Sequence, residues 1–497
     1  MRAFDSIVAN LRRIERVTRP VDPETTEALA RRWEELPNHV KTASQTLGRM
    51  AVGCEGTHGV FPRCNFVCTP CYHSRDANRV RVDGAHTVAE VERQMTLARN
   101  VRGPHAHAQL IGGEVSLLDP DSHAAALASM RRHGREPMSF SHGDFDYEYL
   151  EKVALGRDGK RRFTRLSFAG HFDTLMTGRR GLRRAESEED LNPYRLQFCD
   201  MFRRLRRDHR VRYFLAHNMT VTPANVAAIP QVVRDAHAMG FGMMSFQPAA
   251  FVGDHRRWKE DYGRLGADEV WAKIEEGAGS RLPYDLFQTG DVRCNRTAVG
   301  YYLGKRWFPV LDPEDRRDMA NRDAFYRYLG GVHWGAPLPL LAMRLARVLA
   351  AHPHLLATAA GWIGRRIRKA GGVTSVIRAI WNGDFIPMTF VMHRFIHADH
   401  VAPAWELMQR GEVSNDPAVA EAQERLQACF YAMAHPETGE LVPACVQHAV
   451  LDPAENAQLA QLLPMPSRRP RVSAPTDEAD VPQVPPVAEP APLDAGL

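Results

Sequence analysis

The sequence predicts an α/β protein whose centre is a parallel sheet of about six β/α units. Two observations predict this class. Between residues 51 and 250, short apolar runs typical of strands alternate with longer runs typical of helices. Polar caps and turn residues separate the two kinds of run along this range. Connections of this kind are right-handed and make the strands parallel, and about six units are fewer than the eight that close a barrel.

The strands follow from apolar runs that are rich in branched and aromatic side chains. One strand is expected before Cys64. The others are expected at residues 107–111, 137–141, 165–169, 211–221 and 242–247. Ligands of such folds lie at the carboxyl ends of the strands, so polar residues there are candidates for the functional site.

The helices between these strands are predicted from their amino-terminal signals. Thr87 and Glu90 form a capping box that predicts a helix from there to about Val101. Asp119 before Pro120 predicts the next helix, and a short one is expected near 145–155. The last two helices are predicted to begin at residues 192–193 and 222–223, where an Asn-Pro and a Thr-Pro pair stand.

Four regions are expected along the chain. Residues 1–50 form a helical N-terminal extension, and residues 51–253 form the β/α region. Residues 254–463 form a C-terminal α+β domain. Residues 464–497 are rich in Pro, Ala and Val and cannot bury a core, so we expect a disordered tail.

The composition is that of an ordinary soluble protein, with 44% hydrophobic and 25% charged residues. No apolar stretch is long enough to span a bilayer, and the amino terminus lacks the apolar core of a secretory signal. A net charge of +5 is too small to indicate nucleic-acid binding. Three of the eight cysteines lie in one motif, which favours metal ligation in a reducing compartment and therefore a cytoplasmic protein.

The most informative motif is a cysteine triplet with the spacing C-x3-C-x2-C. Cys64, Cys68 and Cys71 offer three thiolates from one tight loop. A [4Fe–4S] cluster normally takes four cysteines, so three ligands leave one iron open. S-adenosylmethionine can occupy such an iron through its amino and carboxylate groups. The alternative is a structural zinc site, completed by a residue such as His73, although paired knuckles are the usual zinc spacing.

A second motif, Gly112-Gly113-Glu114, follows the strand expected at 107–111. Two glycines let the backbone approach a ligand closely. The Glu114 carboxylate suits the ammonium group of an amino acid.

Together the two motifs resemble the radical S-adenosylmethionine superfamily. The resemblance implies an open (β/α)6 partial TIM barrel with a [4Fe–4S] cluster on Cys64, Cys68 and Cys71. It further implies reductive cleavage of S-adenosylmethionine to a 5′-deoxyadenosyl radical, which abstracts hydrogen from an unactivated carbon. An electron donor such as flavodoxin or ferredoxin is then needed. Tyr72 matches the family's aromatic position close to the adenine.

Several polar residues near strand ends are candidates for binding the cofactor's ribose, carboxylate and adenine. The alternative is that each is a satisfied structural group. The candidates are Ser167, His171, Asn218, Thr220, Gln247, His142 and Asp144. Arg179 and Arg180 form either a clamp for a carboxylate or part of a solvated loop.

Three cysteines lie outside the β/α region. Cys429 and Cys445 stand at the two ends of an expected hairpin, and Cys294 precedes them. They are candidates for an auxiliary iron–sulfur cluster with Cys54, Cys199 or His448 as the fourth ligand. The alternative is that all three are unliganded core residues.

Residues 50–450 also loosely resemble the tetraether lipid synthase branch of the superfamily, through the runs at 268–276 and 294–303 and the hairpin. This resemblance implies a lipid substrate. The family's cysteine-rich element before the barrel is reduced here to Cys54, and its paired cysteines near position 294 are reduced to one. Two other functions stay open: maturation of a peptide or small molecule, and a zinc-stabilised binding protein.

Residues 338–368 are apolar but interrupted by arginines, and they end in a basic run with Trp362 nearby. A basic amphipathic helix of this kind can lie in a membrane interface, which predicts peripheral membrane contact. The alternative is that these helices pack as a lid on the barrel.

Overall fold

The computed structural model describes residues 12–466 of the 497-residue chain. Residues 1–11 of the expected N-terminal extension lie outside the described part. So do residues 467–497, which make up nearly all of the expected disordered tail.

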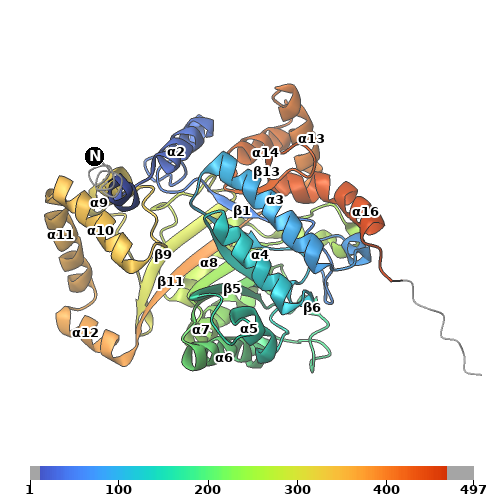
Figure 1. Cartoon of the computed structure of the whole chain (residues 1–497), viewed down its shortest axis with the longest axis horizontal. Helices are drawn as coiled ribbons and strands as arrows, with labels where there is room; N and C mark the ends of the chain where they lie inside the picture. Colours follow the sequence, from blue (N-terminus) through green and yellow to red (C-terminus); the bar gives the residue numbers. More distant parts are fainter. Residues whose placement is uncertain (1–11, 467–497) are drawn as a thin grey trace, which may run out of the picture.

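A large mixed sheet runs through the described residues (Figure 1). Its strand order is β10-β9-β11-β8-β7-β5-β4-β3-β1-β12-β13. The strands are β1 (Cys54–Gly56), β3 (Ala106–Leu110), β4 (Arg135–Ser141), β5 (Arg165–His171), β7 (Arg212–Val221), β8 (Met243–Pro248), β9 (Asn295–Leu303), β10 (Arg306–Pro309), β11 (Phe385–His393), β12 (Tyr431–Ala434) and β13 (Leu441–Pro443). A second, two-stranded sheet pairs β2 (Val67–Cys68) with β6 (Met176–Thr177).

The parallel part of the large sheet is an open barrel. Strands β1, β3, β4, β5, β7 and β8 follow one another in chain order, each parallel to the next. This confirms the predicted open arrangement of about six β/α units. The C-terminal residues extend it at both edges, because β11 pairs in parallel with β8 and β12 pairs in parallel with β1. Within residues 12–466 no pairing joins β11 to β12, so the barrel is not closed.

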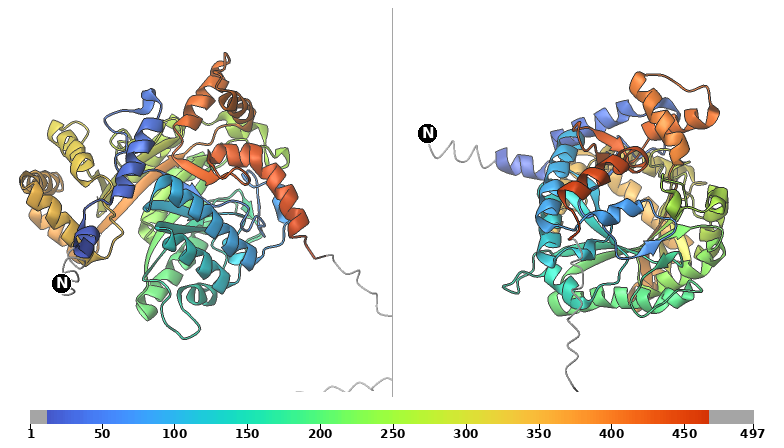
Figure 2. Two further views of the ribbon diagram at one scale, coloured as in Figure 1. Left: turned by 45° about the horizontal axis from the view of Figure 1, so that its top comes forward. Right: turned by 90° about the vertical axis from the view of Figure 1, so that its right-hand side faces the viewer.

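Helices surround this barrel, as the view from the side of α16 shows (Figure 2, right). The helices of the described residues include α2 (Pro23–Glu35), α3 (Gly84–Arg102), α4 (Pro120–Arg132), α5 (Tyr147–Ala154), α6 (Asn192–His209), α7 (Ile229–Met239), α8 (Ala267–Ala278), α9 (Arg316–Leu329), α10 (Leu338–Ala351), α11 (His354–Lys369), α12 (Val373–Asn382), α13 (Ala398–Arg410), α14 (Pro417–Gln427), α15 (Ala444–Val446) and α16 (Asp452–Leu462). Of these, α9 to α12 lie beyond one end of the barrel (Figure 1).

Two predicted helix starts are wrong. Helix α3 begins one turn early, with Asp83 as its cap, because the Thr87 hydroxyl donates to the Val60 carbonyl (2.6 Å) in the protein interior. After β7, Thr222 does not open a helix. Its N–H donates to the Asn225 side chain (2.9 Å) in a turn, and α7 starts only at Ile229.

A buried ion pair joins two barrel strands near their amino ends. Arg135 of β4 donates to both carboxylate oxygens of Glu55 in β1, at 2.9 and 3.0 Å. The side chains of both residues are almost fully buried, and Arg135 also donates to the Gly103 carbonyl (2.7 Å). The bidentate geometry and the extra bond satisfy charges that would otherwise be costly to bury.

Helices α10, α11 and α12 form a helical insertion between β10 and β11. At the basic end of α11, Arg365 and Arg366 pair with the buried Asp318 of α9 (2.7 and 2.6 Å), whereas Arg368 is exposed. Trp362 donates its indole N–H to the Val310 carbonyl (2.8 Å). These three side chains of α11 therefore contact their own chain, although only Leu355 and Arg366 of this helix are buried. The membrane contact expected for residues 338–368 stays a prediction.

No helix within residues 12–466 combines the length and the apolar character needed to cross a bilayer.

Candidate functional site

The cysteine triplet lies on a loop at the carboxyl edge of the barrel. Strand β2, which contains Cys68, pairs with β6 just after the end of β5. The backbone N–H of Cys64 donates to the Asn78 side chain (2.8 Å), and the Tyr262 hydroxyl donates to the Thr69 carbonyl (3.0 Å). Three separate segments thus fix the loop that carries the thiols.

All three thiols line one cavity, which we call the cysteine cavity. Burial, helped by the charge of Glu114, raises the pKa of the Cys64 thiol to about 12. Burial and the neighbouring Cys71 raise the pKa of Cys68 well above its ordinary value. Metal binding at this loop must therefore displace protons from the thiols. Among residues 12–466, no three His, Cys, Asp or Glu side chains surround a position suited to a single metal ion.

A buried cation also lines the cysteine cavity. Arg257 is 4% exposed, and its Nε has no hydrogen-bond partner among the described residues. No carboxylate of residues 12–466 forms an ion pair with it. A guanidinium held in this way is suited to an anionic ligand group. Sequence analysis missed this residue, because one arginine among many has no distinguishing local pattern.

The two glycines of the second motif allow the backbone just before Cys64 to lie close to the end of β3. The N–H of Gly113 donates to the Phe61 carbonyl (2.8 Å), and that of Glu114 donates to the Arg63 carbonyl (2.9 Å). A Cβ on Gly113 would lie 2.1 Å from the Arg63 carbonyl oxygen, and one on Gly112 would lie 2.7 Å from the Phe61 ring. The close approach that the glycines allow is therefore between two backbone segments.

The Glu114 carboxylate is already bonded within the chain. It is 1% exposed and accepts hydrogen bonds from the Ser116 N–H (3.0 Å), the Ser141 hydroxyl (2.8 Å) and the His142 N–H (2.9 Å). It also lines the cysteine cavity. The carboxylate thus orders the end of β4, and its contact with a ligand ammonium group stays a prediction.

His142 supports the cysteine loop. Its Nδ1 accepts from the Asp144 N–H (3.0 Å), so Nε2 carries the proton that it donates to Asn65 (2.9 Å). The ring stacks on Phe66 at 3.8 Å between centroids. Burial lowers the pKa of His142, which keeps the imidazole neutral.

The two neighbouring arginines have separate roles. Arg180 pairs with the carboxylate of Asp144 (3.2 Å) in its own chain. Arg179 is buried, lies over the ring of Phe172 and donates to the carbonyl of His142 (2.9 Å). They do not form one joint clamp.

His171 and Thr220 form a polar edge of the cysteine cavity. His171 Nε2 lies 2.7 Å from Asp173 Oδ2 and 3.2 Å from the Thr220 hydroxyl. Asp173 is buried and also accepts from the Thr220 N–H (3.0 Å). The structure brings these predicted strand-end residues together with the cysteine loop.

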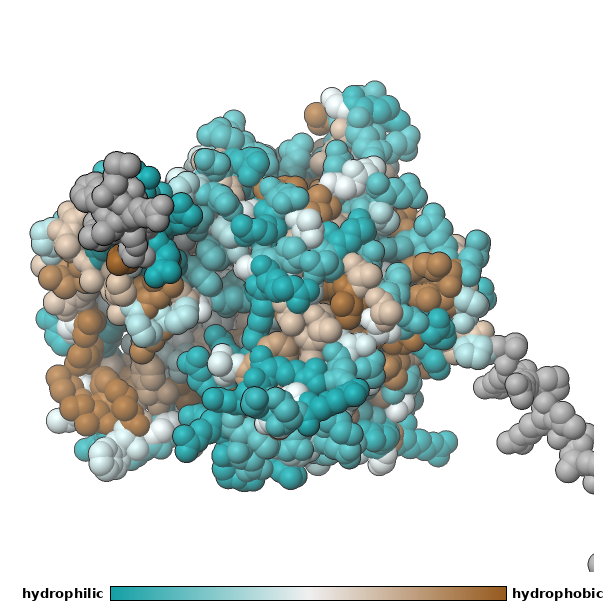
Figure 3. Space-filling model, in the orientation of Figure 1, coloured by the Kyte–Doolittle hydropathy of each residue, from teal (hydrophilic) through white to brown (hydrophobic). Residues whose placement is uncertain are grey.

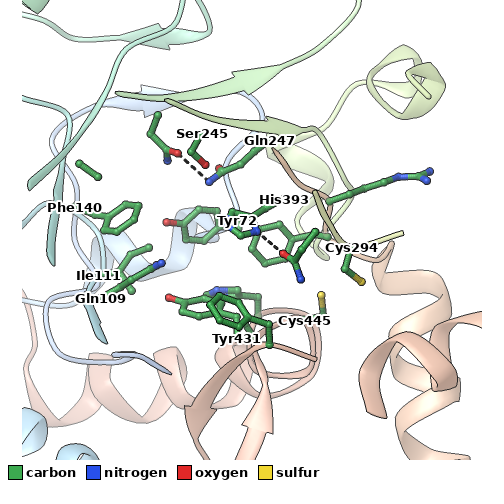
Figure 4. Close-up of a pocket in the computed structure, with 18 of the residues that line it drawn as sticks. Tyr72, Gln109, Ile111, Phe140, Ser245, Gln247, Cys294, His393, Tyr431 and Cys445 are labelled. Atoms are coloured by element: carbon green, nitrogen blue, oxygen red, sulfur yellow. Dashed lines mark hydrogen bonds between the residues drawn. The ribbon is translucent and has the colours of Figure 1, made fainter. Parts of the chain in front are cut away.

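A second cavity, which we call the lumen cavity, lies inside the barrel (Figure 4). Tyr72, Ile111 and Phe140 line both cavities, so the two adjoin. Most of the lumen wall is apolar, and its polar members include Asn218 and Gln247, whose amides are hydrogen-bonded at 3.2 Å.

The predicted binding residue Ser167 lines neither of these cavities. It lies two residues closer to the amino end of β5 than Ala169, which lines the lumen cavity.

The three outlying cysteines meet at the lumen cavity. Cys294, Cys429 and Cys445 all line it, and Figure 4 shows Cys294 and Cys445 on the same side. Arg425 donates to the Cys294 sulfur (3.2 Å), while burial raises the pKa of that thiol to about 11. Of the expected fourth ligands, His448 lines this cavity, whereas Cys54 and Cys199 do not.

His448 is held in a defined orientation. Its Nδ1 lies 2.8 Å from Asp452 Oδ2, and its ring lies 4.8 Å from that of Tyr72. His448 belongs to a π-helical turn, Gln447–Leu451, a rare feature that is frequent at functional sites. Sequence analysis considered His448 only as a metal ligand. The His-x3-Asp spacing, which places both side chains on one helix face, was the available sign of this pair.

No protein-family model matches the chain, and no curated protein matches it either. Among solved structures, SuiB from Streptococcus suis bound to S-adenosylmethionine is 12% identical with a TM-score of 0.27, over 40% of this chain and 41% of SuiB. The protein anSMEcpe with bound AdoMet and a peptide is 14% identical with a TM-score of 0.29, over 45% and 57%.

Coproporphyrinogen III oxidase (HemN) from Escherichia coli, described as a radical SAM enzyme, is 14% identical with a TM-score of 0.30, over 60% of each chain. In all three cases the match spans less than two thirds of the other protein. At such low TM-scores these similarities carry no argument, so the function of this chain is inferred from its own residues.

Proposed function

We propose that this chain is a radical S-adenosylmethionine enzyme. It would bind a [4Fe–4S] cluster and S-adenosylmethionine, cleave the latter reductively and use the 5′-deoxyadenosyl radical to abstract hydrogen from an unactivated carbon. One observation carries the proposal. Cys64, Cys68 and Cys71 line a single cavity at the carboxyl edge of an open parallel barrel, together with a buried cation that no carboxylate of residues 12–466 pairs.

The residues present fit these cofactors. Three thiols line the cavity without a fourth cysteine from the described part of the chain, and Arg257 offers a guanidinium for a carboxylate. When bound, the cluster and S-adenosylmethionine supply the electron transfer and the radical. The protein positions them: His142 and Asn78 fix the cysteine loop, and Tyr72 separates the cysteine cavity from the lumen cavity.

We infer that the substrate binds in the lumen cavity. Met138, Phe140, Met243 and Phe395 make much of its wall apolar, which suits a hydrocarbon part of the substrate. A lipid fits this character, and an apolar side chain of a peptide is the alternative. A flavodoxin or ferredoxin in the cytoplasm is the expected electron donor.

We also propose an auxiliary iron–sulfur cluster on Cys294, Cys429 and Cys445. Their presence on one cavity wall, with His448 beside them, supports it. The alternative is that they are unliganded thiols, which the bond from Cys429 to the Tyr431 carbonyl (3.0 Å) allows.

Anaerobic reconstitution with iron and sulfide tests the main proposal. The reconstituted chain should form 5′-deoxyadenosine under dithionite, and Cys64→Ala, Cys68→Ala or Cys71→Ala should each abolish it. Cys199→Ala is the control, because that thiol lies in the hydrophobic core away from both cavities. A colourless protein with stoichiometric zinc would instead support the zinc-stabilised binding protein.

Iron counting tests the auxiliary cluster. The variant with Cys294, Cys429 and Cys445 all replaced by Ala should lose the iron of one cluster yet still cleave S-adenosylmethionine. If its iron content equals that of the parent, the three cysteines are ordinary core residues.

Arg257→Met tests the anion site. Removing a buried cation that lacks a carboxylate partner should leave the unfolding free energy of the metal-free chain unchanged or raised. Affinity of the reconstituted protein for S-adenosylmethionine should fall roughly ten- to a hundred-fold. Arg256→Met is the matched control, since Arg256 is exposed and paired with Asp76 (2.6 Å). If both variants bind S-adenosylmethionine with equal affinity, Arg257 does not contribute to its binding.

The substrate class is decided by comparing lipids and metabolites between a deletion strain and its parent. A missing lipid supports the lipid assignment, while a peptide or small molecule left unmodified supports maturation.

A further inference from the structure

Helix α12 (Val373–Asn382) has an apolar stripe that its own chain leaves uncovered. Val373, Val376, Ile377, Ile380 and Trp381 recur at the spacing of one helix face. None of the ten residues of α12 is buried. Trp381 is 88% exposed, and Ile377 and Ile380 are each 59% exposed. A stripe of this kind normally packs on a partner, so its exposure indicates an interaction surface.

The exposed stripe is part of a larger apolar patch. The space-filling view shows hydrophobic side chains gathered at the lower left, where α12 lies (Figure 3). Ile363 of α11 and Phe385 of β11 are also exposed, at 48% and 40%. Apolar side chains are therefore exposed on α12 and on the two elements that contact it.

The charge around the patch is mostly positive. Residues 338–385 contain seven arginines and lysines and one carboxylate, the exposed Asp384. Arg368 and Arg378 are exposed and form no ion pair with any carboxylate of residues 12–466. The patch thus pairs uncovered apolar side chains with free positive charge.

We propose that α12 docks the protein onto the surface of an anionic lipid bilayer. Its apolar stripe lies in the interface between head groups and acyl chains, and Arg368 and Arg378 face the anionic head groups. A second copy of this chain is less suitable. In a two-fold interface the patch meets itself, so Arg368 and Arg378 of each copy would face their own equivalents, with Asp384 as the one carboxylate that each copy supplies.

The docking surface lies at the opposite end of the barrel from the cysteine cavity. Strand β11 starts at Phe385, directly after α12, so α12 is at the amino ends of the parallel strands. Figure 1 shows α12 at the lower left and β6, which pairs with the cysteine loop, at the right. Changes in α12 should therefore leave the cofactor site intact, and this proposal stands apart from the proposed function.

Vesicle co-flotation with the full chain tests the proposal. The chain should bind vesicles of phosphatidylglycerol mixed with phosphatidylcholine, and should bind them less as salt is raised, because the charge contribution is screened. It should bind pure phosphatidylcholine vesicles more weakly. The double variant Ile377→Ser with Trp381→Ser should bind about ten-fold more weakly or worse, from the lost apolar burial. Both side chains are exposed, so the variant should fold as the parent does.

Val413→Ser is the matched control, because Val413 is 82% exposed in the turn between α13 and α14, far from α12 in Figure 1. It should bind vesicles as the parent does. The proposal is overturned if the parent does not bind anionic vesicles or if the double variant binds them as well as the parent does. A third outcome is that neither protein binds vesicles, while light scattering finds the parent dimeric and the double variant monomeric. The patch would then be an interface with a second copy.

Discussion

Replacing Gly113 by alanine should destabilise the chain before any cofactor is bound. The added Cβ would lie 2.1 Å from the carbonyl oxygen and 2.2 Å from the carbonyl carbon of Arg63. Both atoms are backbone, so no side-chain rotation relieves the contact, and the cysteine loop must move away from the strand end. The movement breaks the bonds from Gly113 to Phe61 and from Glu114 to Arg63.

The size of the effect is set by those two hydrogen bonds. At about 0.5–1.5 kcal/mol each, their loss lowers the unfolding free energy by about 1–3 kcal/mol. Urea denaturation of the metal-free chain measures it. The displaced loop should also bind less iron on reconstitution, because Cys64 follows Arg63 directly.

Gly364→Ala is the control for this experiment. Gly364 lies inside α11, and a Cβ there would meet no atom within 4 Å. Alanine is the better helix former, so this variant should gain about 0.5–1 kcal/mol. If Gly113→Ala is as stable as the parent without metal and loses only S-adenosylmethionine affinity, the glycines serve a ligand and our interpretation of the close backbone contact fails.

Three further variants test other contacts. Arg135→Met leaves the buried Glu55 without a counter-charge and should cost about 3–5 kcal/mol in urea denaturation, whereas replacing both residues by Met should restore much of that loss. Glu114→Gln places an amide N–H₂ against hydrogen-bond donors, so the metal-free chain should lose about 1.5–3 kcal/mol; an unchanged midpoint would contradict the observed bonding. Burial disfavours the charged form of His58, but the hydrogen bond and charge of Glu455 outweigh it and raise the pKa of His58 above 6.5. The stability from this pair is thus complete below pH 6.5 and lost as the pH rises through the raised value, so the parent's advantage over His58→Gln should shrink at alkaline pH.

Most of the barrel could be predicted because its signals are local. The strands expected at 107–111, 137–141, 165–169, 211–221 and 242–247 match β3, β4, β5, β7 and β8 within two residues at each end. Each of these runs is bounded by turn or cap residues that the sequence displays directly.

The remaining features depend on tertiary contacts that no local pattern encodes. Thr87 and Asp83 can both cap a helix, and the inward bond of the Thr87 hydroxyl to Val60 decides between them. The pairing of β11 with β8 joins residues more than a hundred positions apart. The meeting of Cys294 with the hairpin cysteines depends on that pairing, since β9 runs antiparallel to β11.

The predicted membrane contact of residues 338–368 stays a prediction, but its charge pattern shows the same limit. The basic run at the end of α11 was a clear sequence signal, but Asp318 neutralises two of its arginines. Helix α12 has no buried residue, and its short stripe is no different in sequence from one that packs in a core. Exposure is a property of the fold, so the sequence alone could not distinguish α12 from its neighbours.

The position of β11 and β12 at the two edges of the parallel strands has a consequence for synthesis. Until the last of them has left the ribosome, β1 and β8 present unpaired backbone groups to any passing chain. A fragment that ends near residue 253 would expose both edges permanently and should aggregate or pair with itself. The (β/α)6 region, although continuous in sequence, therefore depends on residues up to 434 to become a finished barrel wall.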